Sequence, residues 1–372
     1  MIMKTTVKLK DIASYSKGSQ INGNNLIENG TYEYLNGGIN PSGKWNEYNV
    51  DGNTITISEG GNSCGYVNYM INPFWCGAHC YYLYDLKCPS EYLYYALKGN
   101  QSSIMKLRSG ACMPNIKKKD LGEFVLSIDL DKNEQDRVIA IFNCLSSIIT
   151  HRRTQLEKLD LLVKARFVEM FGTYPANEYD WEIGTIRDLV TEVRYGSSRK
   201  ASDNNSGKYP YLRMNNITYS GELDLSDTKT IDIPDKELPK CSVRKGDVLF
   251  NRTNSKELVG KTCVYNRDEK MVLAGFIIRI RLNEKMLPDD LSSFLNTDFT
   301  KKMLLEMCKT AIGQANINAQ EMQNIGIYIP PIELQEKFVT FKRQVDKSKA
   351  TVQKALDEAQ LLFDSLMQEY FG

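Results

Sequence analysis

Apolar residues recur at seven-residue intervals in two long stretches that contain neither proline nor glycine. The first follows Asp131 and Glu134, a helix-capping pattern, and runs to Gly172; the second follows Pro330 and Pro331. This spacing predicts two long amphipathic helices that pack on each other, and antiparallel packing would give a pseudo-twofold relation. The predicted seam residues are Phe142, Ile149, Leu156, Val163 and Met170, and Phe338, Val345, Val352, Ala359 and Leu366.

The stretches before these helices have a different texture. They alternate short β-like runs such as NTITIS and CYYLYDL with turns rich in Gly and Asn, and SEYLYYALKGNQSSIMKLR (residues 90–108) has helical spacing. We therefore predict an α+β protein with two globular α/β domains joined by two long antiparallel coiled-coil helices. The predicted order is domain 1–130, helix 131–172, domain 173–330 and helix 331–372.

The two halves repeat each other. FVEMFG ends the first half at Gly172, and MQEYFG occupies residues 367–372. YEYL (residues 32–35) faces YPYL (209–212), and FVLSI (124–128) faces IGIYI (325–329). Such likeness over the length of both halves indicates two homologous units.

Composition places the chain among globular proteins with room for two cores. It has 372 residues, of which 42% are hydrophobic and 25% charged. No apolar run approaches the roughly 20 residues of a membrane span, and the first residues lack the features of a signal peptide, so we expect a cytoplasmic location. The net charge is only +1, so any contact with nucleic acid must come from local clusters.

The nine cysteines are odd in number and suit a reducing compartment. Five possible zinc ligands lie close together in the sequence: Cys64, Cys76, His79, Cys80 and Cys88. However, FWCGAHCYYLY is interpreted as one buried strand, in which adjacent side chains point to opposite faces. Buried thiols are therefore favoured over a metal site, and no cofactor is expected.

The chain resembles the specificity subunits of type I restriction-modification systems over its whole length. The resemblance is carried by ACMPNIKKKDLGEFVLSIDLDKNEQDRVIAIFNCL, which leads into THRRTQLEKL, and by the repeat AIGQANINAQEMQNIGIYIPPIELQEKFV. NGGINPSGKWNEYNVDGNTITISEGG is similar to one type of target-recognition domain. The first half departs from the pattern, because LSIDLDKNEQ lacks the prolines of IYIPPIELQ.

The resemblance implies a non-catalytic subunit. Each globular domain would read one half of a bipartite site in double-stranded DNA, and the helices would set the spacer. Two methyltransferase (modification) subunits and the restriction (motor-nuclease) subunits would be the partners. The alternatives are a stand-alone fused restriction and methylation enzyme and a protein-binding scaffold.

Motifs for catalysis are incomplete. SKELVGKT (residues 255–262) lacks the first glycine of a phosphate-binding loop, and Asn72-Pro73-Phe74 lacks the second proline of an adenine methyltransferase motif. The chain has only two histidines for acid–base chemistry. These gaps disfavour the enzyme interpretation.

The loops contain many groups that can contact bases and phosphates. Arginine pairs with guanine and asparagine with adenine in the major groove, although Asn, Gly and Ser also simply make turns. The candidates in the first domain are Lys17, Ser19, Asn36, Asn40, Lys44, Trp45, Ser58, Asn62 and Asn68. Those in the second are Arg194, Tyr195, Ser197, Ser198, Arg199, Lys200, Arg213, Asn215, Asn216, Asn251, Arg252, Thr253 and Asn254.

A further group precedes each strand–helix junction. It comprises Arg108 and Asn115 in the first half and Gln314 and Asn316 in the second. These side chains either cap the junction or touch phosphate, and the sequence favours neither. Because the candidate loops of the two halves differ in side chains, the two half-sites are expected to differ.

Overall fold

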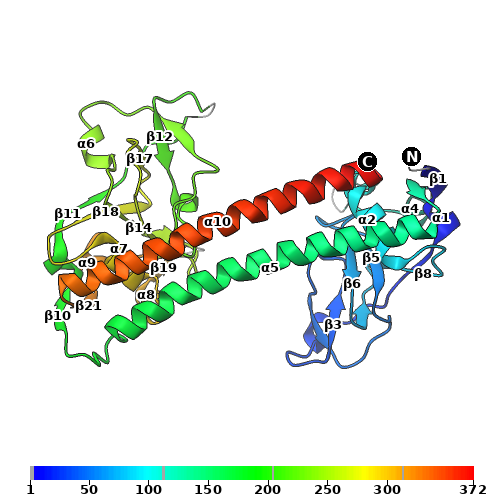
Figure 1. Cartoon of the computed structure of the whole chain (residues 1–372), viewed down its shortest axis with the longest axis horizontal. Helices are drawn as coiled ribbons and strands as arrows, with labels where there is room; N and C mark the ends of the chain where they lie inside the picture. The colour runs from blue at the N-terminus through cyan, green and yellow to red at the C-terminus, as the bar shows by residue number, and fades with distance from the viewer. Residues whose placement is uncertain (1–3, 111–113, 203–204, 312–313) are drawn as a thin grey trace. The chain divides into compact units, whose positions relative to one another are not determined.

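The computed structural model describes residues 4–110, 114–202, 205–311 and 314–372 (Figure 1). The chain forms two compact units: unit 1 consists of Met1–Arg153 and Gln353–Gly372, and unit 2 of Thr154–Val352. Two 40-residue helices, α5 (Lys132–Phe171) and α10 (Ile332–Phe371), each contribute residues to both units. Each unit thus combines a globular α+β segment with parts of both helices.

Unit 1 is built on a four-stranded antiparallel sheet of order β2-β8-β5-β6 and a three-stranded sheet of order β4-β3-β7. In the second sheet β3 pairs in parallel with β7, and a separate antiparallel pair joins β1 to β9. The strands are β1 (Lys4–Lys8), β2 (Ser14–Lys17), β3 (Tyr32–Leu35), β4 (Gly43–Trp45), β5 (Thr54–Ser58), β6 (Val67–Met70), β7 (Phe74–Cys76), β8 (Cys80–Tyr84) and β9 (Val125–Asp129).

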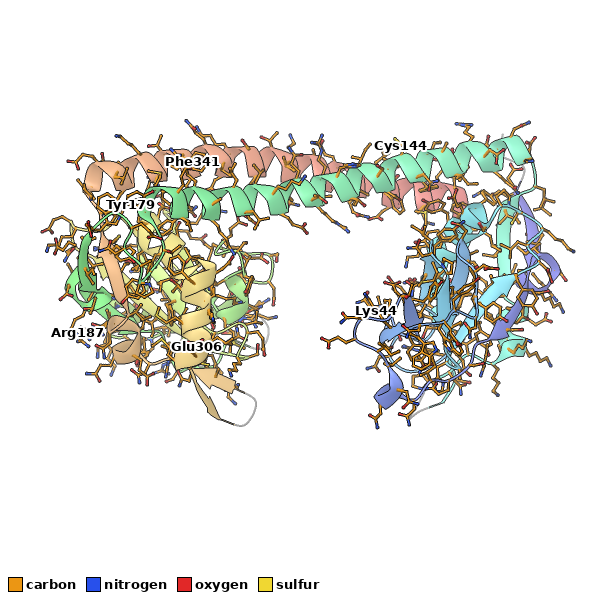
Figure 2. All side chains as sticks on the ribbon, turned by 90° about the horizontal axis from the view of Figure 1, so that it is seen from below. Lys44, Cys144, Tyr179, Arg187, Glu306 and Phe341 are labelled. Carbon is orange, nitrogen blue, oxygen red and sulfur yellow. The ribbon has the colours of Figure 1, made fainter. Side chains whose placement is uncertain are left out.

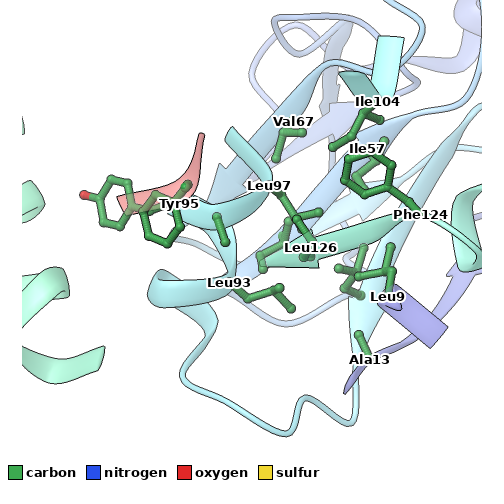
Figure 3. Close-up of a cluster of buried hydrophobic side chains, with 14 of the residues drawn as sticks. Leu9, Ala13, Ile57, Val67, Leu93, Tyr95, Leu97, Ile104, Phe124 and Leu126 are labelled. Carbon is green, nitrogen blue, oxygen red and sulfur yellow. The ribbon is translucent and has the colours of Figure 1, made fainter. Parts of the chain in front are cut away.

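One helix covers the core of unit 1. Helix α2 (Ser90–Gly99) contacts β5, β6 and β9, and its Leu93 and Leu97 are fully buried (Figure 3). Burying each leucine stabilises the fold by roughly 1.5–3 kcal/mol. The shorter helices are α1 (Leu9–Ile12), α3 (Gln101–Met105), α4 (Lys118–Gly122) and the 3-10 turn η1 (Gly23–Asn25).

Two sequence expectations for unit 1 need correction. Residues 90–108 do not form one helix, because α2 ends at Gly99 and α3 begins at Gln101. The Asn100 side chain between them donates to the carbonyl groups of Ala96 and Phe371, which holds the break in place. FWCGAHCYYLY is likewise two strands, β7 and β8, separated by a turn in which the Cys80 N–H donates to the Gly77 carbonyl.

Unit 2 has the same plan. Its four-stranded sheet has the order β11-β18-β14-β16, and β10 pairs with β21. Two three-stranded sheets have the orders β13-β12-β17 and β15-β20-β19. The strands are β10 (Glu182–Thr185), β11 (Val190–Tyr195), β12 (Tyr209–Leu212), β13 (Lys229–Ile231), β14 (Val248–Asn251), β15 (Thr253–Asn254), β16 (Thr262–Val264), β17 (Val272–Leu273), β18 (Ile277–Leu282), β19 (Lys309–Ala311), β20 (Gln314–Asn316) and β21 (Gly326–Ile329). The helices are η2 (Ile186–Leu189), η3 (Met214–Asn216), α6 (Leu238–Cys241), α7 (Pro288–Leu295), α8 (Asp298–Met307) and α9 (Ala319–Gln323).

Apart from the sheet of order β15-β20-β19, the sheets of the two units have the same topology. YEYL forms β3, which pairs in parallel with β7, and YPYL forms β12, which pairs in parallel with β17. The next strand along the chain, β8 or β18, belongs to the four-stranded sheet of its unit. FVLSI and IGIYI contribute β9 and β21, the strands that lead into the two long helices. The repeat seen in the sequence is therefore a repeat of the fold.

The two long helices pack on each other in an antiparallel sense. In unit 1, Phe142 of α5 contacts Phe363 and Phe371 of α10, with ring centroids 5.2 and 5.9 Å apart. In unit 2, Phe167 of α5 contacts Phe338 near the start of α10, at 5.3 Å. All ten predicted seam residues are buried or half-buried.

The start of α5 shows only half of the predicted capping box. The Asp131 carboxylate accepts from the Asn133 and Glu134 N–H groups, at 2.8 and 3.4 Å. The Asp131 N–H donates to Asp129 instead of to Glu134, whose side chain pairs with Arg137. Among the described helices, none combines the length and the low polarity needed to cross a bilayer.

Candidate nucleic-acid interface

The two units share one turn after the first strand of the four-stranded sheet. The Gly18 and Ser19 N–H groups donate to Cys80 and Cys76. In unit 2, the Gly196 and Ser197 N–H groups make the corresponding bonds to Ile277 and Leu273. Among the candidates from sequence, Ser19 is exposed and Ser197 is half-buried.

Glycine is required in this turn. A Cβ atom on Gly18 would lie 1.8 Å from the Cys76 carbonyl oxygen, and one on Gly196 would lie 2.2 Å from that of Ala274. The residues next to these glycines, Lys17 and Tyr195, are exposed in both units. The turn therefore fixes the backbone from which each unit presents a different side chain.

A second shared feature is the end of one inner strand of the four-stranded sheet, β5 in unit 1 and β14 in unit 2. Ser58 ends β5 and Asn251 ends β14, and both are buried, with 2% and 0% of their surface exposed. Ser58 Oγ donates to the Gly37 carbonyl. Thr253, at 7% exposed, is buried just beyond Asn251. All three candidates are buried in this structure, and Ser58 supports a loop through its bond to Gly37, so their contact with DNA stays a prediction.

In unit 1, an ion pair links the turn to the central strand. Lys17 Nζ lies 2.5 Å from Glu59 Oε1, and His79 Nδ1 lies 3.4 Å from Glu59 Oε2. Sequence reasoning missed Glu59, because only basic, amide and hydroxyl groups were sought there. The repeat could have revealed it, because Glu59 follows Ser58 as Arg252 follows Asn251.

The other unit 1 candidates divide into loop supports and exposed groups. The Asn36 side chain accepts from the His79 N–H at 3.2 Å, and Asn68 Nδ2 donates to the Ile39 carbonyl at 3.2 Å. Both asparagines are half-buried. Asn40, Asn62 and Lys44 are exposed, whereas Trp45 is half-buried on β4, the strand that carries Lys44 (Figure 2).

Carboxylates neutralise several of the unit 2 arginines. Arg194 Nε lies 3.2 Å from Glu192, and Arg199 makes a two-point pair with Glu237 at 3.1 and 2.8 Å. The Arg199 hydrogen bond holds the pKa of Glu237 below its usual value. The neighbouring candidates Ser198 and Lys200 are exposed.

A second carboxylate holds the loop before β13. Asp227 accepts from Arg213 at 2.7 Å and from Asn215 at 3.1 Å, and the Arg213 bond lowers the pKa of Asp227. Asn216 is 1% exposed and donates to the Asp224 carbonyl, so we reassign it to a structural role. Arg213 is half-buried and Asn215 exposed.

Arg252 is held differently. Its guanidinium carbon lies 4.7 Å from the centre of the Tyr195 ring, and Nη2 donates to Asn316 Oδ1 at 3.1 Å. Within the described residues, no carboxylate pairs with Arg252, and its buried Nε has no hydrogen-bond partner. Asn254, beside it on β15, is half-buried. Arg252 is thus held by an aromatic ring and an amide instead of by a carboxylate.

Of the residues near the strand–helix junctions, Asn316 does not cap the following helix, because its side chain accepts from Arg252. Contact of this group with phosphate stays a prediction. The N-cap of α9 is Asn318, whose side chain accepts from the Gln320 and Glu321 N–H groups. Asn115 pairs through its backbone with Ser109. In the described part of the chain, no three His, Cys, Asp or Glu side chains are grouped to hold a metal ion.

SKELVGKT does not form an anion-binding loop. Its Lys261 is 6% exposed and donates to the Met214 carbonyl at 2.9 Å. The nearby Lys301 donates to the Gly260 carbonyl at 2.8 Å, and burial lowers the pKa of Lys301 to about 7. Both lysines therefore tie loops of unit 2 together.

Duplicated α+β units with one shared backbone and different exposed side chains define a tandem recognition protein. Residues 2–159 and 178–360 match the type I restriction modification DNA specificity domain, and the chain belongs to this family. The solved S subunit of a type I restriction-modification system from M. genitalium has a similar fold, with a TM-score of 0.61 at 20% identity. The structural match covers 100% of this chain and 96% of the M. genitalium subunit.

Curated relatives carry the same description. A putative type I specificity subunit of Mycoplasma pneumoniae is 31% identical over 221 residues, which are 56% of this chain and 58% of that protein. The putative MjaX specificity subunit of Methanocaldococcus jannaschii is 25% identical over 195 residues, 52% of this chain and 45% of that protein. The chain thus spans about half the length of these two relatives. The EcoKI specificity subunit of Escherichia coli is 23% identical over 336 residues, 84% of this chain and 72% of that protein.

Proposed function

We propose that this chain is the DNA-recognition subunit of a type I restriction-modification complex. Unit 1 reads one half of a bipartite site in double-stranded DNA, and unit 2 reads the other. The observation that carries the proposal is the shared backbone of the two units, on which equivalent positions hold different side chains, as at Lys17 and Tyr195. Sequence is read by side chains at base edges, so such units suit two unlike half-sites.

The chain itself contributes recognition, and the chemistry belongs to partners. We infer that two methyltransferase subunits and the restriction subunits assemble with it, as its family implies. The incomplete phosphate-binding motif, in which Lys261 is buried against a carbonyl group, supports a non-catalytic role.

The two long helices serve as the spacer in this proposal. Each extends over 40 residues, or about 60 Å at 1.5 Å per residue, and their antiparallel seam forms a coiled coil with a pseudo-twofold relation between the repeats. Such a coiled coil would fix the number of base pairs between the two half-sites.

The test is the methylation pattern produced by the purified chain with and without its methyltransferase partner. We expect the chain alone to transfer no methyl group, and the complex to methylate adenine in one asymmetric, bipartite motif. Methyl transfer by the chain alone would favour a stand-alone enzyme. Absence of DNA binding by the complex at low salt would favour a protein-binding scaffold.

A further inference from the structure

Each unit has a pair of neighbouring side chains at two backbone positions that are equivalent in the two units. At the second position, the two units carry side chains of opposite charge. The first position is the last residue of β2 in unit 1, Lys17, and of β11 in unit 2, Tyr195. The second position is the residue that follows β5 in unit 1, Glu59, and β14 in unit 2, Arg252. We call these pairs the strand-end pairs.

The backbone around the second position is the same in both units. The Glu59 N–H donates to the His79 carbonyl, and the Arg252 N–H donates to the Phe276 carbonyl, both at 2.9 Å. The Glu59 carbonyl accepts from Ile116 at 2.9 Å, as the Arg252 carbonyl accepts from Ile317 at 2.9 Å.

The first position is equivalent by strand register. Lys17 pairs with Tyr81 and Tyr195 with Ile278, and each of these partners is the second residue of its strand. The two pairs therefore differ in side chain and not in backbone.

In unit 2 the pair forms an oriented fork of donors. The guanidinium of Arg252 lies over the Tyr195 ring, and its bond to Asn316 restrains it at a second point. Tyr195 is itself held, because its hydroxyl oxygen accepts from the Ala319 N–H at 2.8 Å. A planar guanidinium held in this way suits two-point, directional recognition, whereas a phosphate charge can be met by any flexible lysine.

In unit 1 the same pair presents the opposite chemistry. Glu59 accepts from Lys17 and lies beside His79, so a carboxylate stands where unit 2 has a guanidinium. An ionised carboxylate only accepts hydrogen bonds, so it can meet the cytosine amino group but offers no proton to the two acceptors on the guanine edge.

We propose that the strand-end pairs determine specificity in the two half-sites. Arg252 donates to the O6 and N7 acceptors of one guanine in the half-site read by unit 2. Glu59, which has no proton to donate, does not select guanine at the corresponding base of the half-site read by unit 1. Tyr195 is a positioning residue, because it acts by orienting Arg252. The proposal rests on the proposed function, since it assigns residues within the same DNA-reading surfaces.

The test uses the full complex and the motif that it methylates. We expect Arg252→Gln and Arg252→Lys to lower the preference for guanine at one base of the second half-site by roughly 5- to 100-fold, with the first half-site unchanged. Arg187→Gln is the matched control, because Arg187 Nη2 also donates to an asparagine, Asn324, at 2.9 Å (Figure 2). This control should leave the motif unchanged.

A second pair of variants tests the equivalence of the positions. Tyr195→Leu keeps the charge of Arg252 and removes its stacking partner, so the same guanine preference should weaken. Introducing Lys17→Tyr together with Glu59→Arg should create a guanine preference in the first half-site only. Circular dichroism and thermal melting establish that each variant is folded.

Three outcomes would overturn the proposal. The first is a folded Arg252→Gln complex with an unchanged motif. The second is a uniform loss of affinity with the salt slope reduced by about one, which marks a phosphate contact. The third is an unchanged first half-site in an active Lys17→Tyr, Glu59→Arg complex. If instead the unaltered complex binds no DNA sequence specifically, the proposed function itself fails.

Discussion

Lys349 Nζ donates to the Glu222 carboxylate, which ties helix α10 to the loop between β12 and β13 within unit 2. Asp160 of α5 accepts from the same ammonium group. Only 11% of the Lys349 side chain is exposed, so solvent screens this contact less than it screens a surface pair. The loop that carries Arg213 and Asn215 is thus anchored to α10 and, through Lys349, is linked to α5.

Replacing Lys349 should loosen this loop. We expect Lys349→Met to lower the free energy of unfolding by roughly 1–2 kcal/mol and to speed hydrogen exchange in residues 213–225. In a double-mutant cycle with Glu222→Gln, the coupling energy should be about 1 kcal/mol. Lys354→Met, an exposed lysine on the same helix, is the control and should change stability by less than about 0.5 kcal/mol. Zero coupling would mean that the two residues act independently.

Phe142 should be one of the most sensitive positions of unit 1. It is fully buried and stacks on Tyr95 at 4.9 Å, besides its contacts with α10. Phe142→Ala should lower the free energy of unfolding by roughly 3–5 kcal/mol in urea denaturation, because it leaves a cavity between the helices and α2.

Cys144 is the control for this change, because it is exposed on the same helix (Figure 2). Cys144→Ala should shift the free energy of unfolding by no more than about 0.5 kcal/mol. A loss below about 1 kcal/mol for Phe142→Ala would contradict the packing described for this seam.

Asp290 should make unit 2 less stable as the pH rises. Burial and, to a smaller extent, the neighbouring Asp289 raise the pKa of Asp290 to about 8, against the opposing effect of Lys342. The unfolded carboxyl ionises near pH 4, so between about pH 4 and pH 8 the folded chain holds a proton that unfolding releases. Over this range the group should reduce the free energy of unfolding by about 1.4 kcal/mol for each pH unit.

The neutral variant Asp290→Asn should remove that slope. Its stability relative to the unaltered protein should therefore increase from pH 5 to pH 8, as measured by urea denaturation at each pH. Asp298→Asn replaces an exposed carboxylate of the same unit and should keep the original slope. Parallel pH profiles for the Asp290 variant and the unaltered protein would show that this carboxyl stays ionised in the fold.

A heptad inserted in both long helices should lengthen the recognised spacer. The insertions would follow Leu156 in α5 and Val352 in α10, which the Asp160–Lys349 contact places near each other. Seven residues add about 10 Å, or roughly three base pairs, and keep the apolar seam in register. We expect the complex to methylate the same half-sites with a spacer about three base pairs longer.

Insertion of two residues at each site is the control for register. It rotates the apolar stripes out of the seam, so assembly or folding should be lost. An active heptad variant with an unchanged spacer would show that the coiled coil does not set the distance.

The sequence predicted the fold well where periodicity or repetition carried the signal. Heptad spacing and the absence of proline and glycine located both long helices, and YEYL and YPYL marked the same strand in both units. It failed where tertiary contacts decide, as at Asn100, whose side chain bonds to Phe371 far along the chain and breaks a helix that spacing alone would continue.

For the candidate site, residue type could not distinguish exposed side chains that are available for DNA contact from buried side chains that hold the loops. Asn215 and Asn216 are adjacent and chemically identical, yet one is exposed and the other is buried. Charge was also misleading, because Arg199 is neutralised by Glu237 and Arg252 has no such partner among the described residues. Pairing across 38 positions of sequence depends on the folded loops, which no local pattern encodes.

The division of unit 1 between two distant stretches has a consequence for biosynthesis. Its core includes Met367, Tyr370 and Phe371, which pack with residues from the first half of the chain. Because domains fold as the ribosome delivers their residues, the core of unit 1 stays incomplete until all of unit 2 has been translated. During that interval the nascent first half exposes apolar surface. The folding of unit 1 in the cell should therefore depend on chaperones more than the folding of unit 2, whose chain is continuous.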